Sequence, residues 1–189
     1  MTQATTPHQD HTALSSVKSD LLYEVVDGHI VEKEPMGAYE ILLGSFLNTR
    51  LDSFARESNC GRAVSEMLFE LGAGRSQRRP DVAYVSYDRW PRQRLVPRLQ
   101  AWAVVPELAV EEVSPSNTFE EVLGKVHEYF QAGVQHVWVI APPPQQVYVY
   151  QSPSHIRVLN VQDALTGDPF LPGFRLQLSE LFDVEATET

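Results

Sequence analysis

The chain has 189 residues, a formal net charge of −10 at pH 7 and 43% hydrophobic residues. This size and composition are typical of one globular domain with a sizeable core, and the acidic balance argues against nonspecific coating of nucleic acid. No apolar run approaches the roughly 20 residues of a membrane helix, and the N-terminus lacks the apolar segment of a secretory signal. We therefore expect no membrane partner. Cys60 is the only cysteine, which excludes an internal disulfide and predicts a cytoplasmic location.

The N-terminal part of the chain predicts a tail, a hairpin and a helix. We expect a disordered tail over residues 1–18 and a single domain over residues 19–189. Alternating apolar residues on both sides of Asp27-Gly28 predict a β-hairpin over residues 21–33, because this dipeptide suits the positive φ angles of a two-residue turn. Apolar residues spaced by three and four predict an amphipathic helix over residues 38–56.

The middle of the chain predicts two strands and two loops. Loose alternation predicts a strand over residues 61–71, and the β-branched and aromatic residues of DVAYVSY predict another over residues 81–87. The intervening residues 72–79 combine glycine with arginine and are expected to form a loop. Residues 88–103 contain two prolines and two tryptophans without a helical period, which predicts a long loop.

A strand, a helix and a second strand organise the chain. Apolar runs predict strands over residues 106–113 and 135–141. The helix between them is expected to begin at a capping box of Asn117 and Glu120 and to end at Gly133. A crossover of this length joins parallel strands, so the two strands should be parallel neighbours in one sheet. The predicted buried face of the helix consists of Phe119, Val122, Leu123, Val126, Tyr129 and Phe130.

The C-terminal part predicts smaller elements. Three consecutive prolines interrupt the chain after the second strand. Short strands are then predicted over residues 146–150 and 156–161. The segment DPFLPGFRLQLSELF predicts a loop followed by a short helix that packs on the body of the protein.

Two acidic positions mark a candidate site. Asp81 opens a predicted strand directly after Pro80, and Glu111 ends the next predicted strand after an apolar run. If these strands are neighbours, the two carboxylates converge at one edge, where they either share a proton or hold a cation. A hard divalent ion such as Mg²⁺ fits one or two carboxylates plus a backbone carbonyl. Lys125 lies just outside the apolar arc of the predicted helix, so its ammonium can reach that edge and stabilise negative charge.

These residues resemble the PD-(D/E)XK nuclease pattern, in which Pro-Asp opens one strand and an acidic residue and a lysine follow. The chain is also similar, over about residues 21–182, to a bacterial family of putative restriction endonucleases long catalogued as a domain of unknown function. The matching segments are YEVVDGHIVEKEP, RRPDVAYV, PELAVEEVSPSN, KVHEYFQAGVQHVWVI and DPFLPGFRLQLSELF. The resemblance implies a restriction-endonuclease-like α/β (α+β) fold. Its core would be an αβββαβ mixed sheet flanked by helices, with an N-terminal hairpin and C-terminal strands added.

The resemblance also implies a function and a set of site residues. It implies a metal-dependent DNA endonuclease in which Asp81, Glu111 and Lys125 are catalytic. Mg²⁺, or Mn²⁺, would be bound by Asp81, Glu111 and the backbone carbonyl of Glu112. Two departures from the pattern stand out. The lysine that ordinarily follows two residues after the acidic one is Val113 here, and the position of a family histidine holds Tyr39, followed by Glu40, which can reach the metal.

Simpler interpretations of the site residues remain open. Asp81 can be an exposed strand start, and Glu111 and Glu112 can be one solvated and one salt-bridged residue at a strand end. Lys125 can be a surface lysine that pairs with Glu121 or Glu128 at helical spacing. A nuclease fold without catalysis, which serves as a nucleic-acid-binding or interaction protein, is the alternative function.

An arginine-rich segment offers a second alternative. Residues 75–98 hold seven arginines and two aspartates in an otherwise acidic chain. Arg75, Arg78 and Arg79 either contact DNA phosphates, with Trp90 or Trp102 packed under the nucleic-acid backbone, or pair with carboxylates of the protein itself. Nothing in the pattern separates DNA from RNA, and a homodimer is expected only by analogy with other enzymes of this fold.

Overall fold

The computed structural model describes residues 22–72, 76–114 and 116–183, so the predicted tail over residues 1–18 lies outside it. Within these ranges, no helix has the length and apolar character needed to cross a membrane. In chain order, the elements are β1 (Tyr23–Val26), β2 (His29–Glu32), α1 (Ala38–Glu57), β3 (Gly61–Ser65), β4 (Phe69–Leu71), β5 (Ser76–Arg78), β6 (Val82–Ser86), β7 (Leu108–Glu112), α2 (Phe119–Ala132), β8 (His136–Ala141), β9 (Gln146–Ser152), β10 (His155–Asn160), β11 (Ala164–Thr166), β12 (Arg175–Gln177) and α3 (Leu178–Phe182).

A six-stranded mixed sheet forms the centre of the protein. Its strand order is β10-β9-β8-β7-β6-β3, and α1, β3, β6, β7, α2 and β8 supply the predicted αβββαβ core. Strands β7 and β8 are parallel, with Leu108 opposite His136, which confirms the predicted crossover through α2. The other neighbours in this sheet are antiparallel. In the pair β6-β7, Val82 lies opposite Val110.

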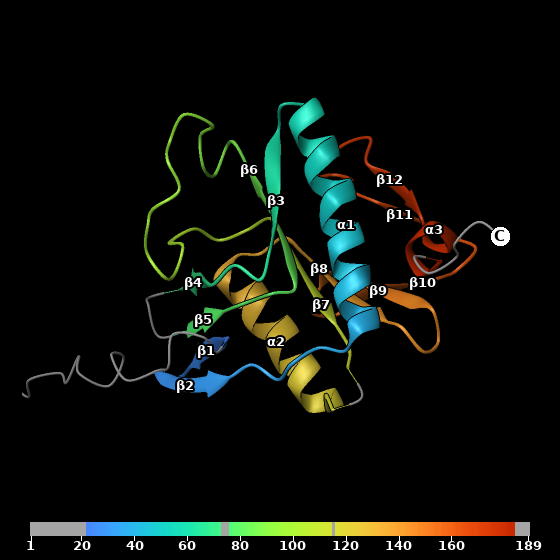
Figure 1. Cartoon of the computed structure of the whole chain (residues 1–189), viewed down its shortest axis with the longest axis horizontal. Helices are drawn as coiled ribbons and strands as arrows, with labels where there is room; N and C mark the ends of the chain where they lie inside the picture. The colour runs from blue at the N-terminus through green and yellow to red at the C-terminus, as the bar shows by residue number, and fades with distance from the viewer. Residues whose placement is uncertain (1–21, 73–75, 115, 184–189) are drawn as a thin grey trace, which may run out of the picture.

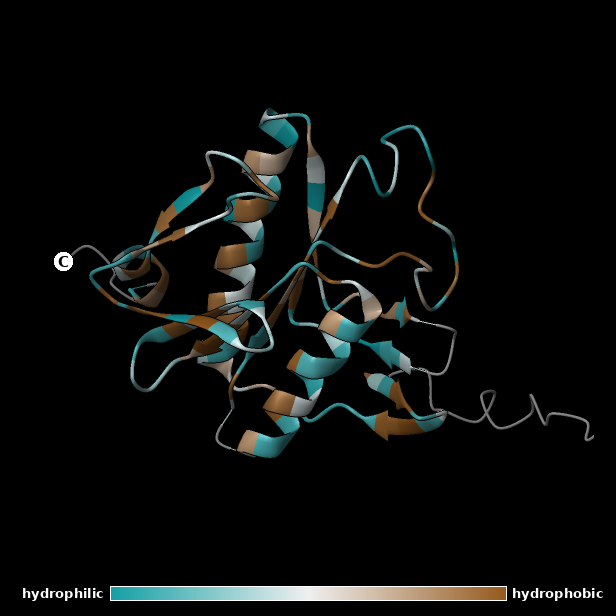
Figure 2. Cartoon of the chain, turned by 180° about the vertical axis from the view of Figure 1, so that it is seen from behind, coloured by the Kyte–Doolittle hydropathy of each residue, from teal (hydrophilic) through white to brown (hydrophobic). Residues whose placement is uncertain are grey.

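The two long helices cover opposite faces of this sheet (Figures 1 and 2). Along β7, Leu108 and Val110 pack with α1, whereas Ala109 packs with α2, because successive strand side chains point to opposite faces. Brown and teal stretches alternate along α2 in Figure 2, as expected for a helix with one buried side. The alternation of β7 therefore sends Glu111 toward α2 and Glu112 toward α1.

A smaller sheet of order β2-β1-β5-β4 lies beside the central one. Its hairpin β1-β2 confirms the predicted turn at Asp27-Gly28, where both residues have positive φ. The single strand predicted over residues 61–71 is wrong, because the chain breaks at Glu66, whose φ is 52°. The part before the break, β3, pairs with β6, and the part after it, β4, pairs with β5. Strand β5 itself lies inside residues 72–79, which were expected to form a loop.

The start of α2 also differs from the prediction. Thr118, rather than Asn117, caps the helix and forms a reciprocal capping box with Glu121. The amide oxygen of Asn117 instead accepts a hydrogen bond from the backbone N–H of Ser114. Phe119 was expected on the buried face but is 76% exposed. The helix ends at Gly133 in the left-handed conformation, as predicted.

The long connection between β6 and β7 contains no strand or helix, as predicted. Both of its tryptophans, Trp90 and Trp102, are buried on the sheet face that carries α2. Their rings pack edge to face with 5.3 Å between the ring centres. Trp102 also forms an isolated bridge to Phe69. The interpretation in which a tryptophan packs under a nucleic-acid backbone is therefore wrong for both residues.

Candidate active site

Asp81 lies where the central sheet meets the smaller one. Its backbone N–H donates to the carbonyl of Val110 at 3.0 Å, which fixes it beside the end of β7. Its Oδ2 accepts from the backbone N–H of Glu112 at 2.6 Å, and its Oδ1 accepts from Lys33 Nζ at 2.7 Å. Burial, followed by the negative charge of Glu111, raises the pKa of Asp81 to about 6.

Glu111 is fully surrounded and held by α2. Its Oε2 accepts from Lys125 Nζ at 2.7 Å, and its Oε1 accepts from the Tyr129 hydroxyl at 2.5 Å. Burial alone would raise its pKa, but the nearby ammonium groups of Lys125 and Lys33 bring the pKa of Glu111 below its ordinary value. Of the two neighbouring carboxylates, Glu111 therefore stays ionised more readily than Asp81.

Lys125 points into the protein. Its Nζ lies 2.7 Å from Glu111 and 3.8 Å from Glu24, and its side chain is 20% exposed. Burial opposes the charged form, yet the two carboxylates raise the pKa of Lys125. The interpretation of Lys125 as a surface lysine paired along its own helix is wrong. The structure thus brings Asp81, Glu111 and Lys125 together as predicted.

Two hollows open on these residues. One, of about 390 Å³, is lined by charged side chains that include Glu24, Asp81, Glu111 and Lys125. The other, of about 570 Å³, lies between β2, the start of α1 and the break after β3. Asp81 and Lys33 line both hollows, so Asp81 is shared between them.

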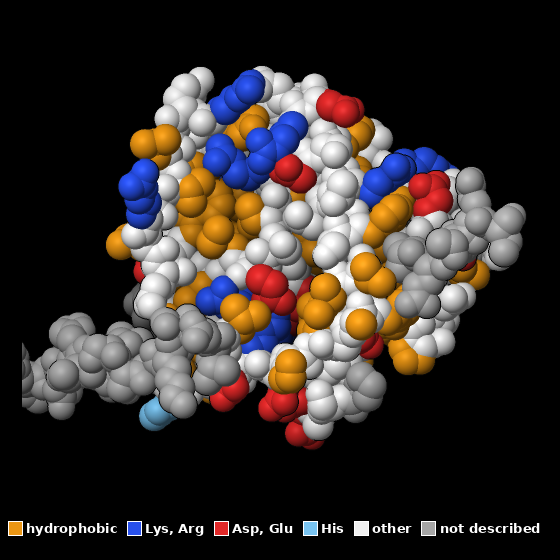
Figure 3. Space-filling view, viewed as in Figure 1, with side chains coloured by type: hydrophobic (Ala, Val, Ile, Leu, Met, Phe, Trp, Pro, Cys, Tyr) orange, Lys and Arg blue, Asp and Glu red, His pale blue; other side chains and the backbone are white. Residues whose placement is uncertain are grey.

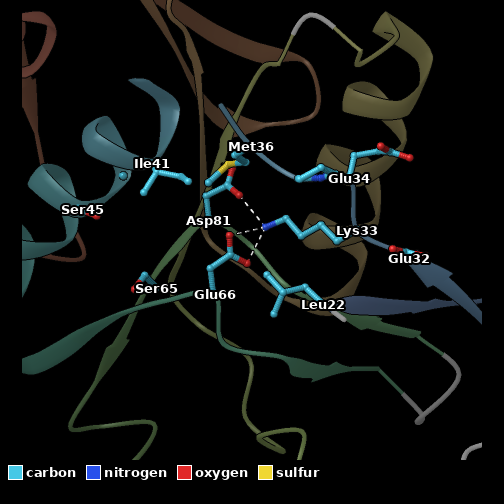
Figure 4. A pocket seen from close by; sticks show the side chains of 12 residues that line it. Leu22, Glu32, Lys33, Glu34, Met36, Ile41, Ser45, Ser65, Glu66 and Asp81 are labelled. Atoms are coloured by element: carbon cyan, nitrogen blue, oxygen red, sulfur yellow. Dashed lines mark hydrogen bonds and ion pairs between the residues drawn. The ribbon is translucent and has the colours of Figure 1, made fainter. Parts of the chain in front are cut away.

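Lys33 and Glu66 belong to the site although the sequence did not indicate them. The Lys33 ammonium lies between Asp81 and Glu66, at 2.7 Å and 2.8 Å (Figure 4). Lys33 follows a short hairpin strand, and Glu66 falls inside a run that reads as one strand, so neither stands out by local pattern.

Glu112 has an unusual environment on the α1 face. Both of its carboxylate oxygens are buried without a hydrogen-bond partner, and its Oε1 would lie 2.7 Å from a Cβ added at Gly44. Glycine at position 44 therefore makes room for this side chain. Burial, with the negative charges of Asp81 and Glu40, raises the pKa of Glu112 to about 9. The predicted use of its backbone carbonyl as a metal ligand stays a prediction.

The donor atoms at the site suit a hard divalent cation. Among the residues that the structure describes, no group of three or more His, Cys, Asp or Glu side chains is arranged to hold a metal ion. Asp81 and Glu111 nevertheless offer two carboxylates at one edge, which is enough for Mg²⁺ because this ion keeps several water ligands. Both carboxylates attract an ammonium, and the buried oxygens of Glu112 accept no hydrogen bond. The chemistry of these groups favours positive charge.

Two of the arginines expected to contact phosphates are engaged within the protein. Arg78 is buried, and its guanidinium bonds Glu24 at 2.8 Å and Glu128 at 2.5 Å. Arg79 donates to the main-chain carbonyls of Tyr23 and Glu66. For Arg78 the structure shows the alternative, a pairing with carboxylates of the protein itself. Arg75 lies outside the described residues.

Comparisons with known proteins show the family of the chain and its fold. The model of the Uma2 family, described as a putative restriction endonuclease, matches residues 9–179. The crystal structure of a putative nuclease belonging to DUF820 from Anabaena variabilis ATCC 29413 is similar over 91% of this chain and 96% of its own, with 20% identity and a TM-score of 0.79. That likeness shows a shared fold. A DrdV–DNA complex solved by cryo-electron microscopy matches 76% of this chain and 11% of its own at 14% identity, with a TM-score of only 0.40. No curated protein matches.

Proposed function

Because the chain belongs to the Uma2 family of putative restriction endonucleases, we propose that it is a Mg²⁺-dependent nuclease that hydrolyses phosphodiester bonds in DNA. The observation that carries this proposal is the meeting of Asp81, Glu111 and Lys125 at one charged hollow, although they come from three separate elements. An acid pair with a neighbouring ammonium matches the chemistry needed to hold a cation and a phosphate together.

Each residue has a distinct task in this proposal. Asp81 and Glu111, with the backbone carbonyl of Glu112, would hold Mg²⁺ or Mn²⁺. Such a cation polarises a phosphoryl oxygen and lowers the pKa of a bound water. The Lys125 ammonium, fixed by Glu111, offers positive charge to the developing negative charge of the scissile phosphate. Tyr129 holds the Glu111 carboxylate in place from the far side.

The surface offers a further contact for the nucleic-acid backbone. Arg92, Arg94 and Arg98 are exposed on the loop between β6 and β7, and none forms an ion pair with a described residue. Figure 3 shows basic side chains in the upper left part of the molecule, where Figure 1 draws this loop. The Arg94 guanidinium lies 3.7 Å from the centre of the Trp90 ring, which holds it in place. We propose that these arginines, rather than Arg78, contact phosphates.

A binding protein without catalysis is the second candidate. Val113 stands where the superfamily pattern has a lysine, and Lys33 and Lys125 already balance the charges of Asp81 and Glu111. A site balanced in this way is complete without a cation. Metal binding therefore separates the two candidates.

The variant Asp81→Asn tests the proposed nuclease. Removal of this carboxylate charge should abolish Mg²⁺-dependent cleavage of supercoiled and linear DNA in a gel assay, because one of the two proposed carboxylate ligands loses its charge. Asp88→Asn, at an exposed position after β6, is the matched control and should cleave like the wild type. Circular dichroism should show that both variants keep the fold. Undiminished cleavage by Asp81→Asn would remove Asp81 from the mechanism.

A further inference from the structure

Four oxygen atoms surround the Lys33 ammonium. Its Nζ lies 2.7 Å from Asp81 Oδ1, 2.8 Å and 2.9 Å from the two carboxylate oxygens of Glu66, and 3.1 Å from the carbonyl oxygen of Arg79. The Lys33 side chain is only 10% exposed. Burial opposes its charge, yet the carboxylates of Asp81, Glu111 and Glu66 bring the pKa of Lys33 above its ordinary value. The ammonium is therefore a permanent charge at neutral pH.

This set of neighbours resembles the shell of a metal ion. Two carboxylates and a backbone carbonyl are the oxygen ligands that hard divalent cations prefer. An ammonium has three N–H donors, so four oxygens within 3.1 Å exceed what it can bond individually. A surface ion pair would need a single carboxylate. The four oxygens converge on one point, as oxygen ligands do around a divalent metal ion.

The backbone conformation of Glu66 helps to hold its carboxylate beside Lys33. Glu66 has φ of 52°, in the left-handed region that non-glycine residues rarely adopt. Its backbone N–H donates to the carbonyl of Asp81 at 3.2 Å, which ties the two residues together. Figure 4 shows Lys33 reaching between these carboxylates from the other side, beside the apolar side chains of Leu22 and Met36. Three segments distant in sequence thus build the shell.

We propose that the Lys33 ammonium takes the place of a second divalent cation, so that the site binds one metal ion, on the Glu111 side of Asp81. This inference rests on the proposed function, because it assumes that a metal binds between Asp81 and Glu111. Nucleases with two metal ions use both to stabilise charge around the phosphate. Here a lysine built into the hairpin supplies the second positive charge. Lys33 is therefore a positioning residue that fixes Asp81 and neutralises Glu66.

Calorimetric titration with Mn²⁺ tests the proposal through the number of ions bound. The wild type is expected to bind one ion per chain. The variant Lys33→Gln frees the Asp81 and Glu66 oxygens and is expected to bind two. The double variant Lys33→Gln with Glu66→Gln removes one of these ligands and is expected to return to one. Arg50→Gln is the matched control, since it removes a cation from an exposed ion pair with Glu180 and should leave the number at one.

Stability supplies a second measurement. Mn²⁺ should raise the Tm of Lys33→Gln more than that of the wild type, because the added ion replaces the missing ammonium. If Lys33→Gln does not fold alone, recovery of its fold with two bound Mn²⁺ supports the proposal, and no recovery overturns it. Two ions on the wild type, or one on a folded Lys33→Gln, also overturn it while the proposed nuclease stands. No ion on the wild type overturns the proposed function and this inference with it.

Discussion

Glu112 is buried in the fold at an electrostatic cost. Its carboxyl group is buried beside Gly44 without a hydrogen-bond partner, and its pKa is raised to about 9. At neutral pH it therefore holds a proton, which avoids a buried charge. In the unfolded chain the same group ionises near its ordinary value of 4.5. Folding is thus coupled to uptake of a proton at this position.

The variant Glu112→Gln should reveal this coupling in the absence of divalent ions. A raised pKa in the folded state means that its contribution to stability is greatest below pH 4.5 and is lost as the pH rises toward 9. The free energy of unfolding of the wild type should fall relative to Glu112→Gln by up to about 1.4 kcal/mol per pH unit across this window. Urea denaturation between pH 5 and 9 measures it, with the exposed Glu120→Gln as control. A difference independent of pH would contradict the shifted pKa.

The sequence indicated some of these residues and not others, for a physical reason. Asp81 and Glu111 could be predicted because a Pro-Asp strand start and a charge after an apolar run are unusual in a local pattern. Lys33 and Glu66 could not, since their importance arises only when a hairpin and a strand break meet in space. The need for glycine at position 44 likewise arises from a contact between distant segments, because the Glu112 side chain occupies the space that a Cβ there would fill.

Arg78 on β5 connects the smaller sheet to α2. Its guanidinium bridges Glu24 on β1 and Glu128 on α2, with its own side chain 11% exposed. Glu24 also accepts a hydrogen bond from the backbone N–H of Arg79 at 2.9 Å. This buried ion pair holds the hairpin, and with it Lys33, against the central sheet. Loss of the arginine would leave the buried Glu24 carboxylate without its closest cation.

We expect Arg78→Met to lower the free energy of unfolding by about 3 kcal/mol, because buried Glu24 would lose its closest cation and keep only Lys125 at 3.8 Å. The addition of Glu24→Gln should recover part of the loss by removal of that charge. Urea denaturation of both variants gives the two values. Wild-type stability in Arg78→Met together with weaker DNA binding would instead support a direct phosphate contact by this arginine.

The elements of the core could be predicted because their signals are local. The hairpin turn at Asp27-Gly28, the stripe of α1 and the crossover through α2 depend on spacing within one segment. The break at Glu66 could not be predicted, since residues 62–71 alternate without a glycine or proline to mark it. There, pairing with β5 decides the outcome, and residues 76–78 become a strand only because that partner is present.

Charge is distributed unevenly over the whole molecule. The protein is acidic overall, yet the loop between β6 and β7 carries exposed arginines that form no ion pair with any residue in the described ranges (Figure 3). A local basic surface on an acidic protein attracts a polyanion to one place and repels it elsewhere. In the proposed nuclease, the loop would therefore orient the nucleic acid as well as attract it. Its buried tryptophans keep this surface anchored to the core.

The triple variant Arg92→Gln, Arg94→Gln and Arg98→Gln should weaken DNA binding through the loss of phosphate contacts. In fluorescence anisotropy with labelled duplex DNA and EDTA, we expect affinity to fall at least tenfold. The slope of log K against log salt should decrease by up to about 3. The exposed pair Arg157→Gln with Arg175→Gln, on β10 and β12, is the control and should bind as the wild type does. An unchanged salt slope in the triple variant would exclude the loop as the contact surface.

The pairing of β1 with β5 also orders events during folding. Val25 lies opposite Gln77, so this ladder closes a far longer loop than the hairpins of the central sheet, whose strands β8, β9 and β10 follow one another directly. Long loop closure loses more chain entropy and is slower. Lys33 follows the hairpin β1-β2, whereas Asp81 and Glu111 belong to the central sheet. We therefore expect a nascent molecule to bring the two carboxylates together first and to add their counter-ion Lys33 last.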